Sequence, residues 1–259
     1  MPEHILFSVE NQVARIVLNR PQVFNSMHHA MRQEILAALE TCKNESAIRA
    51  VYLTGAGRAF CAGEDLQEVV APDGPSLNQI ISTGYNPIVL SIRNLEKPVV
   101  CAVNGVAAGA GANIALACDI TVAAVSASFT QAFSKIGLIP DSGGTWTLPR
   151  LVGLQRAAAL MMLSDKIPAT EAAAIGMIWK TFSDETFADE SLKLAETLAQ
   201  MPTKGLGLTK RALNRAFSQD FAAQLAAEDE LQTAAGQTAD YREGVAAFLE
   251  KRKPRFTGN

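Results

Sequence analysis

The chain has little of the chemistry that histidine and cysteine provide. Only three histidines occur among its 259 residues. His4 lies near the N-terminus, and His28 and His29 stand at the start of an expected helix without catalytic partners. Neither a Ser/His/Asp triad nor a metal site is therefore supported. The four cysteines show no CxxC spacing, so we expect a reduced, cytoplasmic protein.

Excess charge of one sign and a strongly apolar run are also lacking. The net charge of −3 gives no broad attraction to nucleic acid. No basic region followed by an apolar stretch opens the chain, so we expect no secretory signal. Residues 98–118 hold 21 positions without a charge, but alanine, glycine, Asn104 and Asn113 make their transfer into a bilayer poor. We expect neither a nucleic-acid partner nor a membrane span.

The first part of the chain predicts a hairpin followed by a helix. Residues 5–19 contain two apolar stretches separated by Glu10 and Asn11, a pattern typical of two paired strands. Apolar residues then recur at helical spacing, and Asn25 or Ser26 is the expected cap of that helix.

Apolar strands and helices alternate through the next part of the chain. Buried strands are expected over residues 50–54, 98–103 and 119–124, with a short strand around residues 128–129 and a small-residue helix over residues 109–117. This alternation indicates mainly parallel sheets with connecting helices. Beyond about residue 190 only helical patterns occur. We predict a core over residues 1–190 that contains the active site, and a helical region over residues 191–259.

The first motif is RAFCAGEDL over residues 58–66, directly after a strand and a Gly-Ala-Gly turn. These glycines could serve only to turn the chain. Alternatively, the small residues Ala62 and Gly63 let a ligand approach exposed backbone N–H groups. Glu64 and Asp65 would then position the segment or cap a helix.

The second motif is NGVAAGAGAN over residues 104–113. Its glycines do not fit the spacing of a dinucleotide-binding loop, and no Gly-Lys-Ser/Thr sequence supports a phosphate-binding loop. Close packing of a helix on a sheet is one interpretation. The other is a strand that runs into a helix N-terminus, where free N–H groups suit a developing negative charge.

The third motif places Asp141 between Pro140 and two glycines within residues 129–146. The aspartate could cap the helix that is expected to begin near Ser142. Its apolar surroundings could instead desolvate the carboxylate, which would raise its pKa and suit it to proton transfer. The sequence leaves both interpretations open.

Together, and in this order, the three motifs resemble the enoyl-CoA hydratase/isomerase (crotonase) superfamily, and the similarity covers essentially the whole chain. The resemblance implies an α/β fold, a crotonase-like spiral of ββα turns with a C-terminal helical trimerisation region. It also implies a homotrimer or dimer of trimers. The expected ligand is an acyl-CoA thioester, with coenzyme A as part of the substrate and no separate cofactor.

Carried over by position, the resemblance assigns the catalytic carboxylate to Asp141 and an oxyanion hole to the N–H groups of Ala62 and Ala110. Segment 59–66 would lie along the pantetheine and adenine, and a residue of the last helix would help to close the site on its own or a neighbouring subunit. The implied substrate and CoA contacts are Ala59, Phe60, Cys61, Gly63, Asp65, Leu66, Asn113, Phe133, Trp146, Phe248 and Lys251.

Two departures from the superfamily pattern indicate the type of reaction. Hydratases of the superfamily hold a water between two glutamates, and those positions are Asn113 and Phe133 here. The carboxylate stands instead at Asp141, where isomerase and dehalogenase members have theirs. Residues 101–116, 132–150 and 239–249 resemble those of isomerases of phenylacetate degradation, which convert ring-1,2-epoxyphenylacetyl-CoA to oxepin-CoA and move a 3-enoyl double bond to the 2-position.

Other activities remain as alternatives. A generic enoyl-CoA hydratase of fatty-acid β-oxidation would need a second carboxylate, for which Glu64 and Asp65 are the nearby candidates. A dehalogenase-like enzyme would use Asp141 as a nucleophile. An RNA-binding role is disfavoured by the acidic balance of charge. The prolines and glycines of residues 69–86 predict a mobile cover over the site.

Overall fold

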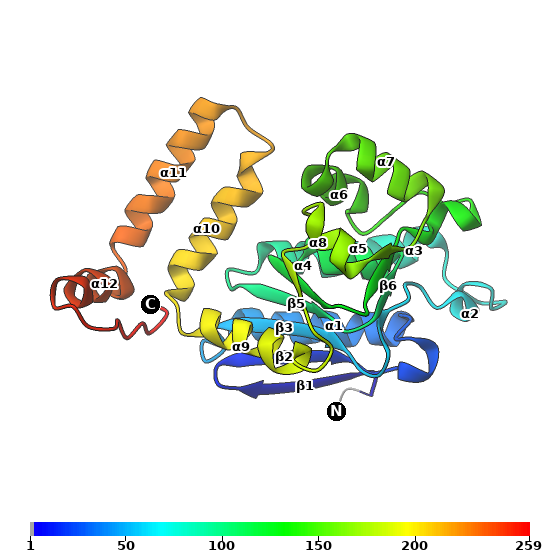
Figure 1. Cartoon of the computed structure of the whole chain (residues 1–259), viewed down its shortest axis with the longest axis horizontal. Helices are drawn as coiled ribbons and strands as arrows, with labels where there is room; N and C mark the ends of the chain where they lie inside the picture. The colour runs from blue at the N-terminus through cyan, green and yellow to red at the C-terminus, as the bar shows by residue number, and fades with distance from the viewer. Residues whose placement is uncertain (1–2) are drawn as a thin grey trace.

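The computed structural model describes residues 3–259, which form two β-sheets, covering helices and a projecting C-terminal helical region (Figure 1). The larger sheet has the order β1-β2-β3-β5-β7-β10. Its first pair is antiparallel and the remaining pairs are parallel. The strands are β1 (Ile5–Glu10), β2 (Val13–Leu18), β3 (Ala50–Gly55), β5 (Val99–Val103), β7 (Ile120–Ala124) and β10 (Lys180–Phe182).

The strands of the smaller sheet follow one another in chain order, as those of the larger sheet do. The order in the smaller sheet is β4-β6-β8-β9, with only the last pair antiparallel. Its strands are β4 (Ala59–Cys61), β6 (Val106–Ala108), β8 (Ser128–Thr130) and β9 (Ile167–Pro168). Consecutive strands β3 and β4, β5 and β6, and β7 and β8 each place one member in either sheet before the chain continues into helix. The predicted spiral of ββα turns is confirmed.

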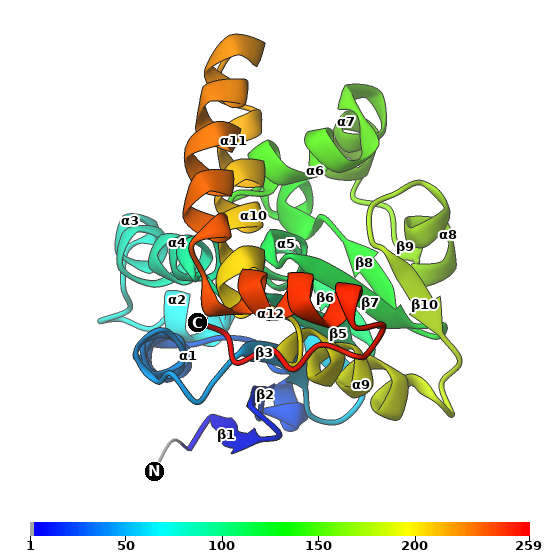
Figure 2. The same ribbon diagram turned by 90° about the vertical axis from the view of Figure 1, so that its left-hand side faces the viewer.

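Helices enclose the sheets on their outer faces (Figures 1 and 2). Between β2 and β5 the helical segments are η1 (Pro21–Val23), α1 (His29–Asn44), α2 (Leu66–Val69), α3 (Leu77–Ile80), the π-helical turn η2 (Ile81–Tyr85) and α4 (Asn86–Asn94). After β6 they are α5 (Ala110–Ala117), η3 (Ala132–Ile136), α6 (Gly144–Val152), α7 (Leu154–Leu163) and α8 (Ala169–Ala174). The segment expected to be a loop cover therefore contains α3 and η2.

The start of α1 differs from the prediction. His28, not Asn25 or Ser26, is the N-cap, and its Nδ1 accepts from Met31 N at 3.2 Å. Asn25 is fully buried with a left-handed φ of 55°. Its Nδ2 donates to Ala59 O at 2.8 Å. Asn25 thus ties the loop before α1 to the segment that carries the first motif.

Helix α5 lies in the centre of the molecule. All of its residues are buried, because small side chains allow it to pack between the sheets and α6. A Cβ on Gly111 would lie 2.5 Å from Cys61 O, so only glycine permits this approach of α5 to β4. The close-packing interpretation of the second motif is confirmed. The uncharged run 98–118 folds into β5, β6 and α5.

The C-terminal part of the chain consists of α9 (Phe187–Ala199), α10 (Thr203–Ala216), α11 (Phe221–Gly236) and α12 (Ala239–Leu249). The predicted boundary after residue 190 falls inside α9, which packs on β3 and β5 of the larger sheet. Helices α10 and α11 form a pair that projects from the core, and α12 crosses their base (Figures 1 and 2). Within residues 3–259, no helix combines the length and the apolar character needed to cross a bilayer.

Candidate active site

The N-terminus of α5 presents free backbone donors beside the first motif. Gly109, with φ of 52°, turns the chain from β6 into α5. Ala110 N–H has no acceptor within residues 3–259. A Cβ on Gly63 would lie 3.6 Å from Ala110 N and 3.1 Å from Ala108 O. Because Gly63 has no side chain and a φ of 96°, its backbone lies directly against the start of α5.

The prediction that Ala62 N–H is the second oxyanion donor is wrong. Ala62 N–H already donates to Phe24 O at 3.0 Å, so it has no hydrogen left for a ligand. The free donor is Glu64 N–H, which has no acceptor in the described chain. The peptide that carries it begins at Gly63, beside Ala110. The pair of candidate donors is therefore Glu64 N–H and Ala110 N–H.

Asp141 is half-buried and does not cap a helix. Helix α6 begins at Gly144 with Gly143 as N-cap and no side-chain cap, so the capping interpretation is wrong. Burial raises the pKa of Asp141, and a hydrogen bond from Ser142 opposes this rise. That bond joins Ser142 Oγ to Asp141 Oδ1 at 2.8 Å. No salt bridge holds the carboxylate among residues 3–259.

Asn113 connects α5 to the backbone of Asp141. It follows Ala110 by almost one helical turn on α5 and is fully buried. Its Nδ2 donates to the backbone oxygen of Asp141 at 2.9 Å, and its Oδ1 accepts from Gln131 Nε2 at 2.8 Å. A Cβ on Gly144 would lie 2.3 Å from Asn113 Nδ2. Asn113 therefore bonds to the backbone of Asp141, and its amide is buried.

Apolar groups surround this arrangement. The ring of Phe133 lies 3.8 Å from the position of a Cβ on Gly109, at the start of α5. Val89 on α4 lies 3.6 Å from the position of a Cβ on Gly143, two residues after Asp141. Trp146 contacts other partners, since its ring is 6.4 Å from that of Phe217 on α10. The structure brings Phe133 to the donors and places Trp146 between α6 and α10.

The remaining residues of the first motif have different environments. Ala59, Phe60 and Cys61 form the buried strand β4, with side chains that are at most 1% exposed. Their side chains belong to the core and cannot line a ligand. Asp65 accepts from Gln67 N as the N-cap of α2, which confirms the predicted capping role, and Leu66 is exposed.

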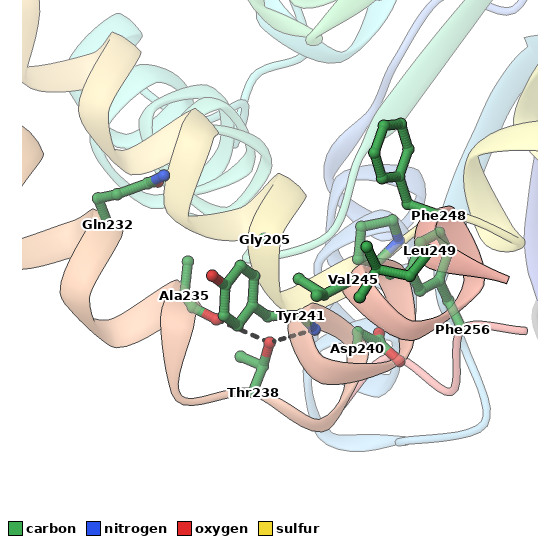
Figure 3. Close-up of a pocket in the computed structure, with 12 residues that line it drawn as sticks. Gly205, Gln232, Ala235, Thr238, Asp240, Tyr241, Val245, Phe248, Leu249 and Phe256 are labelled. Carbon is green, nitrogen blue, oxygen red and sulfur yellow. Dashed lines mark hydrogen bonds between the residues drawn. The ribbon is translucent and has the colours of Figure 1, made fainter. Parts of the chain in front are cut away.

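Phe248 and Lys251 do not meet the other predicted site residues within one chain. Phe248 is 83% exposed on α12, and α12 lies apart from α5 and α6 (Figures 1 and 2). It lines a different cavity of about 470 Å³ between α10, α11, α12 and the C-terminal tail (Figure 3). The acid there, Asp240, accepts from Thr257 N at 2.7 Å and Gly258 N at 2.8 Å. Asp240 therefore holds the C-terminal tail against α12.

The ββα spiral, the free N–H groups at the start of α5 and the neighbouring carboxylate define the class of protein. A model of the enoyl-CoA hydratase/isomerase family matches residues 8–259, and the chain belongs to this family. It is an enzyme that acts on CoA thioesters.

Individual relatives support this assignment over the full length. The chain is 50% identical to 1,2-epoxyphenylacetyl-CoA isomerase of Escherichia coli K12 over 261 aligned residues, which cover 100% of both chains. It is 47% identical to a probable enoyl-CoA hydratase of Rhodobacter capsulatus, with 98% of both chains covered. The crystal structure of enoyl-CoA hydratase from Bacillus anthracis superposes with a TM-score of 0.95 at 32% identity, covering 99% of this chain and 100% of the other.

Proposed function

We propose that this chain is an acyl-CoA isomerase that uses Asp141 as its only acid–base residue and the N–H groups of Glu64 and Ala110 as its oxyanion hole. The observation that carries the proposal is the absence of a second usable carboxylate at the site in the described chain. Asn113 and Phe133 occupy the positions of the hydratase glutamates. Glu64 and Asp65 are bound by Arg32 and Arg20, respectively.

The mechanism begins with the thioester oxygen between the two N–H donors. Removal of a proton from C2 turns the thioester into an enolate, and the donors stabilise its oxygen by about 3 kcal/mol each. Asp141 takes this proton and returns it at C4, so the double bond moves from C3–C4 to C2–C3 and no atom is lost. The apolar surroundings of Asp141 favour this exchange, because a desolvated carboxylate is a stronger base.

The acyl group is proposed from the comparison with the isomerase of 50% identity. Ring-1,2-epoxyphenylacetyl-CoA would be converted to oxepin-CoA, with the oxyanion hole drawing electron density from the ring through the carbonyl. A 3-enoyl-CoA in phenylacetate degradation is the second substrate. The apolar ring of Phe133 beside Gly109 supports an aromatic acyl group at this position.

The Asp141→Asn variant tests the mechanism. Its kcat for isomerising a 3-enoyl-CoA should fall by about 10²–10⁴-fold, the typical contribution of acid–base catalysis, while the acyl-CoA still binds. Steady-state kinetics and calorimetric titration measure these two effects. Since burial raises the pKa of Asp141, the folded state disfavours the charge, and the neutral variant should melt no lower than wild type at pH 7. An active Asp141→Asn enzyme excludes the mechanism.

The alternative is a generic enoyl-CoA hydratase of fatty-acid β-oxidation, and the relative of 47% identity is a probable enoyl-CoA hydratase. Parallel assays with crotonyl-CoA, a 3-enoyl-CoA and epoxyphenylacetyl-CoA separate the two. The proposal predicts slow hydration of crotonyl-CoA and fast turnover of at least one isomerase substrate. Hydration faster than both isomerisations favours the alternative.

We also propose a homotrimer or dimer of trimers that works in the cytoplasm without a separate cofactor. Exposed apolar side chains on α12, among them Phe248 and Leu249, support an assembly through the C-terminal helices. In such an assembly Phe248 and Lys251 would reach the CoA site of a neighbouring subunit. The four buried, unpaired cysteines support a reducing compartment.

A further inference from the structure

A buried ion-pair cluster lies behind the candidate donor at Glu64. Arg32, on α1, is 1% exposed and donates from Nη1 to both Glu64 carboxylate oxygens at 2.7 and 2.6 Å. The hydroxyl of Tyr85 donates to Glu64 Oε2 at 2.6 Å. Arg32 also reaches Glu68 at 3.0 Å. Three hydrogen bonds thus hold the carboxylate of the residue whose backbone N–H is free.

The same arginine holds the backbone next to the donor. Arg32 Nη1 donates to Met27 O at 3.2 Å. Met27 N donates to Gly63 O at 2.8 Å, and Asp65 N donates to Met27 O at 2.9 Å. The peptide between Gly63 and Glu64 is therefore fixed on both sides by Met27. The side chain of Glu64 is fixed by Arg32. The direction of the Glu64 N–H depends on these contacts.

The cluster is built from features that cost stability. The Nε of Arg32 is buried without an acceptor within residues 3–259, and burying a charged group is expensive unless it is well paired. A Cβ on Gly84 would lie 2.7 Å from Arg32 Cδ, so only glycine leaves room for the arginine. Gly84 and Tyr85 belong to the π-helical turn η2, a rare backbone form that occurs frequently at functional sites.

We propose, building on the proposed function, that Arg32 and Tyr85 act through the Glu64 carboxylate as positioning residues for the oxyanion hole. The side chain of Glu64 is an anchor, and its backbone N–H is the working group. Since a donor is effective only when it points at the developing oxyanion, weakening the anchor weakens polarisation of the thioester carbonyl. The contact of Tyr85 with Glu64 also connects η2 to the residue that carries the donor.

The test uses Glu64→Gln and Tyr85→Phe, each also made in an Asp141→Asn background that prevents turnover. The probe is crotonyl-CoA labelled with ¹³C at the thioester carbonyl. Difference infrared spectra of the bound probe measure carbonyl polarisation, because hydrogen bonds lower the stretching frequency. We expect both changes to reduce the bound-state frequency shift. With Asp141 intact, kcat should fall by about tenfold in Glu64→Gln and less in Tyr85→Phe, with KM changed by less than about threefold.

Glu68→Gln is the matched control. It makes the same substitution on another partner of Arg32, but the Glu68 backbone lies in α2 and carries neither candidate donor. Its carbonyl shift and kcat should stay at the wild-type value. If Glu64→Gln does not fold, Tyr85→Phe decides, since it removes only one hydroxyl.

The outcomes separate this inference from the proposed function. An unchanged carbonyl shift in folded Glu64→Gln or Tyr85→Phe overturns the positioning role, whatever reaction the enzyme performs. A reduced shift in these variants together with an active Asp141→Asn enzyme supports the positioning role and overturns Asp141 as the base. A carbonyl unshifted even with the cluster intact overturns the oxyanion hole and both proposals.

Discussion

Asp141 owes its chemistry to the few groups that surround its carboxylate. Burial raises its pKa, and the hydroxyl of Ser142 is the one side chain that donates to it within residues 3–259. The backbone carbonyl oxygen of Asp141 accepts a hydrogen bond from Asn113. The carboxylate is therefore fixed in place through its backbone while remaining only weakly stabilised as an anion. This combination suits a base that must take up a proton and release it.

The pH dependence of the reaction tests this balance. The proposed mechanism needs the ionised form of Asp141, so kcat/KM should fall as the pH decreases through a pKa above the ordinary aspartate value. Ser142→Ala removes a hydrogen bond to the charged form, which raises the pKa further. The acid limb of the profile should move to higher pH, while the rate on the plateau changes little. An acid limb at or below the wild-type position contradicts this account.

At the scale of elements, a buried ion pair fastens α10 to the core. Lys210 Nζ on α10 lies 2.7 Å from Asp119 Oδ2, at the start of β7. Asp119 Oδ2 also accepts from Val99 N at 2.8 Å. Lys210 and Asp119 have side chains that are 8% and 18% exposed. Either charge would be costly without the other.

Loss of the Lys210 side chain should therefore weaken the attachment of α10 to the core. Lys210→Met is expected to lower the free energy of unfolding by about 3–5 kcal/mol, because Asp119 keeps a buried charge without its partner. Equilibrium unfolding in urea measures the loss. Arg211→Met is the control on the neighbouring residue, whose pair with Glu96 is exposed and should contribute at most about 1 kcal/mol. Equal losses in the two variants would show that burial of the Lys210 pair does not matter.

At the scale of the whole molecule, the C-terminal helices leave apolar surface uncovered. Phe248 and Leu249 are 83% and 74% exposed, and α10 and α11 extend away from the sheets (Figure 1). Among residues 3–259, α11 packs mainly on α10 and α12, whereas α10 also contacts α4. Burial of such a surface between subunits would contribute favourable free energy.

The proposed assembly is tested by Phe248→Glu. A charge in the centre of an apolar interface should shift the enzyme from trimer toward monomer in light scattering coupled to size-exclusion chromatography. The folded fraction by circular dichroism should not change, since the side chain is exposed in one chain. Leu6→Glu, on the exposed face of the edge strand β1, is the control and should keep the wild-type mass. A monomeric wild-type enzyme contradicts the proposed trimer.

The sequence by itself determined the order of the main elements and pointed to Asp141 as the candidate base. Residues 50–54 and 98–103 were recognisable as strands because buried parallel strands consist of continuous apolar runs. Asp141 was favoured because the family resemblance places a carboxylate there, while Asn113 and Phe133 stand at the positions of the hydratase glutamates. The strands β4, β6, β9 and β10 escaped prediction, since each has three residues or fewer and no period can be read from so short a segment.

Only the tertiary structure decided which backbone N–H groups and which polar side chains already have hydrogen-bond partners. Ala62 and Glu64 carry the same backbone N–H, and the one difference is that Phe24 accepts the hydrogen of Ala62. Asn113 looked like a pocket residue until its bonds to Gln131 and Asp141 were seen. The Glu64 carboxylate looked like a possible second base until Arg32 was found on it. Hydrogen-bond partners come from distant parts of the chain, so their occupancy is a property of the fold that no local pattern contains.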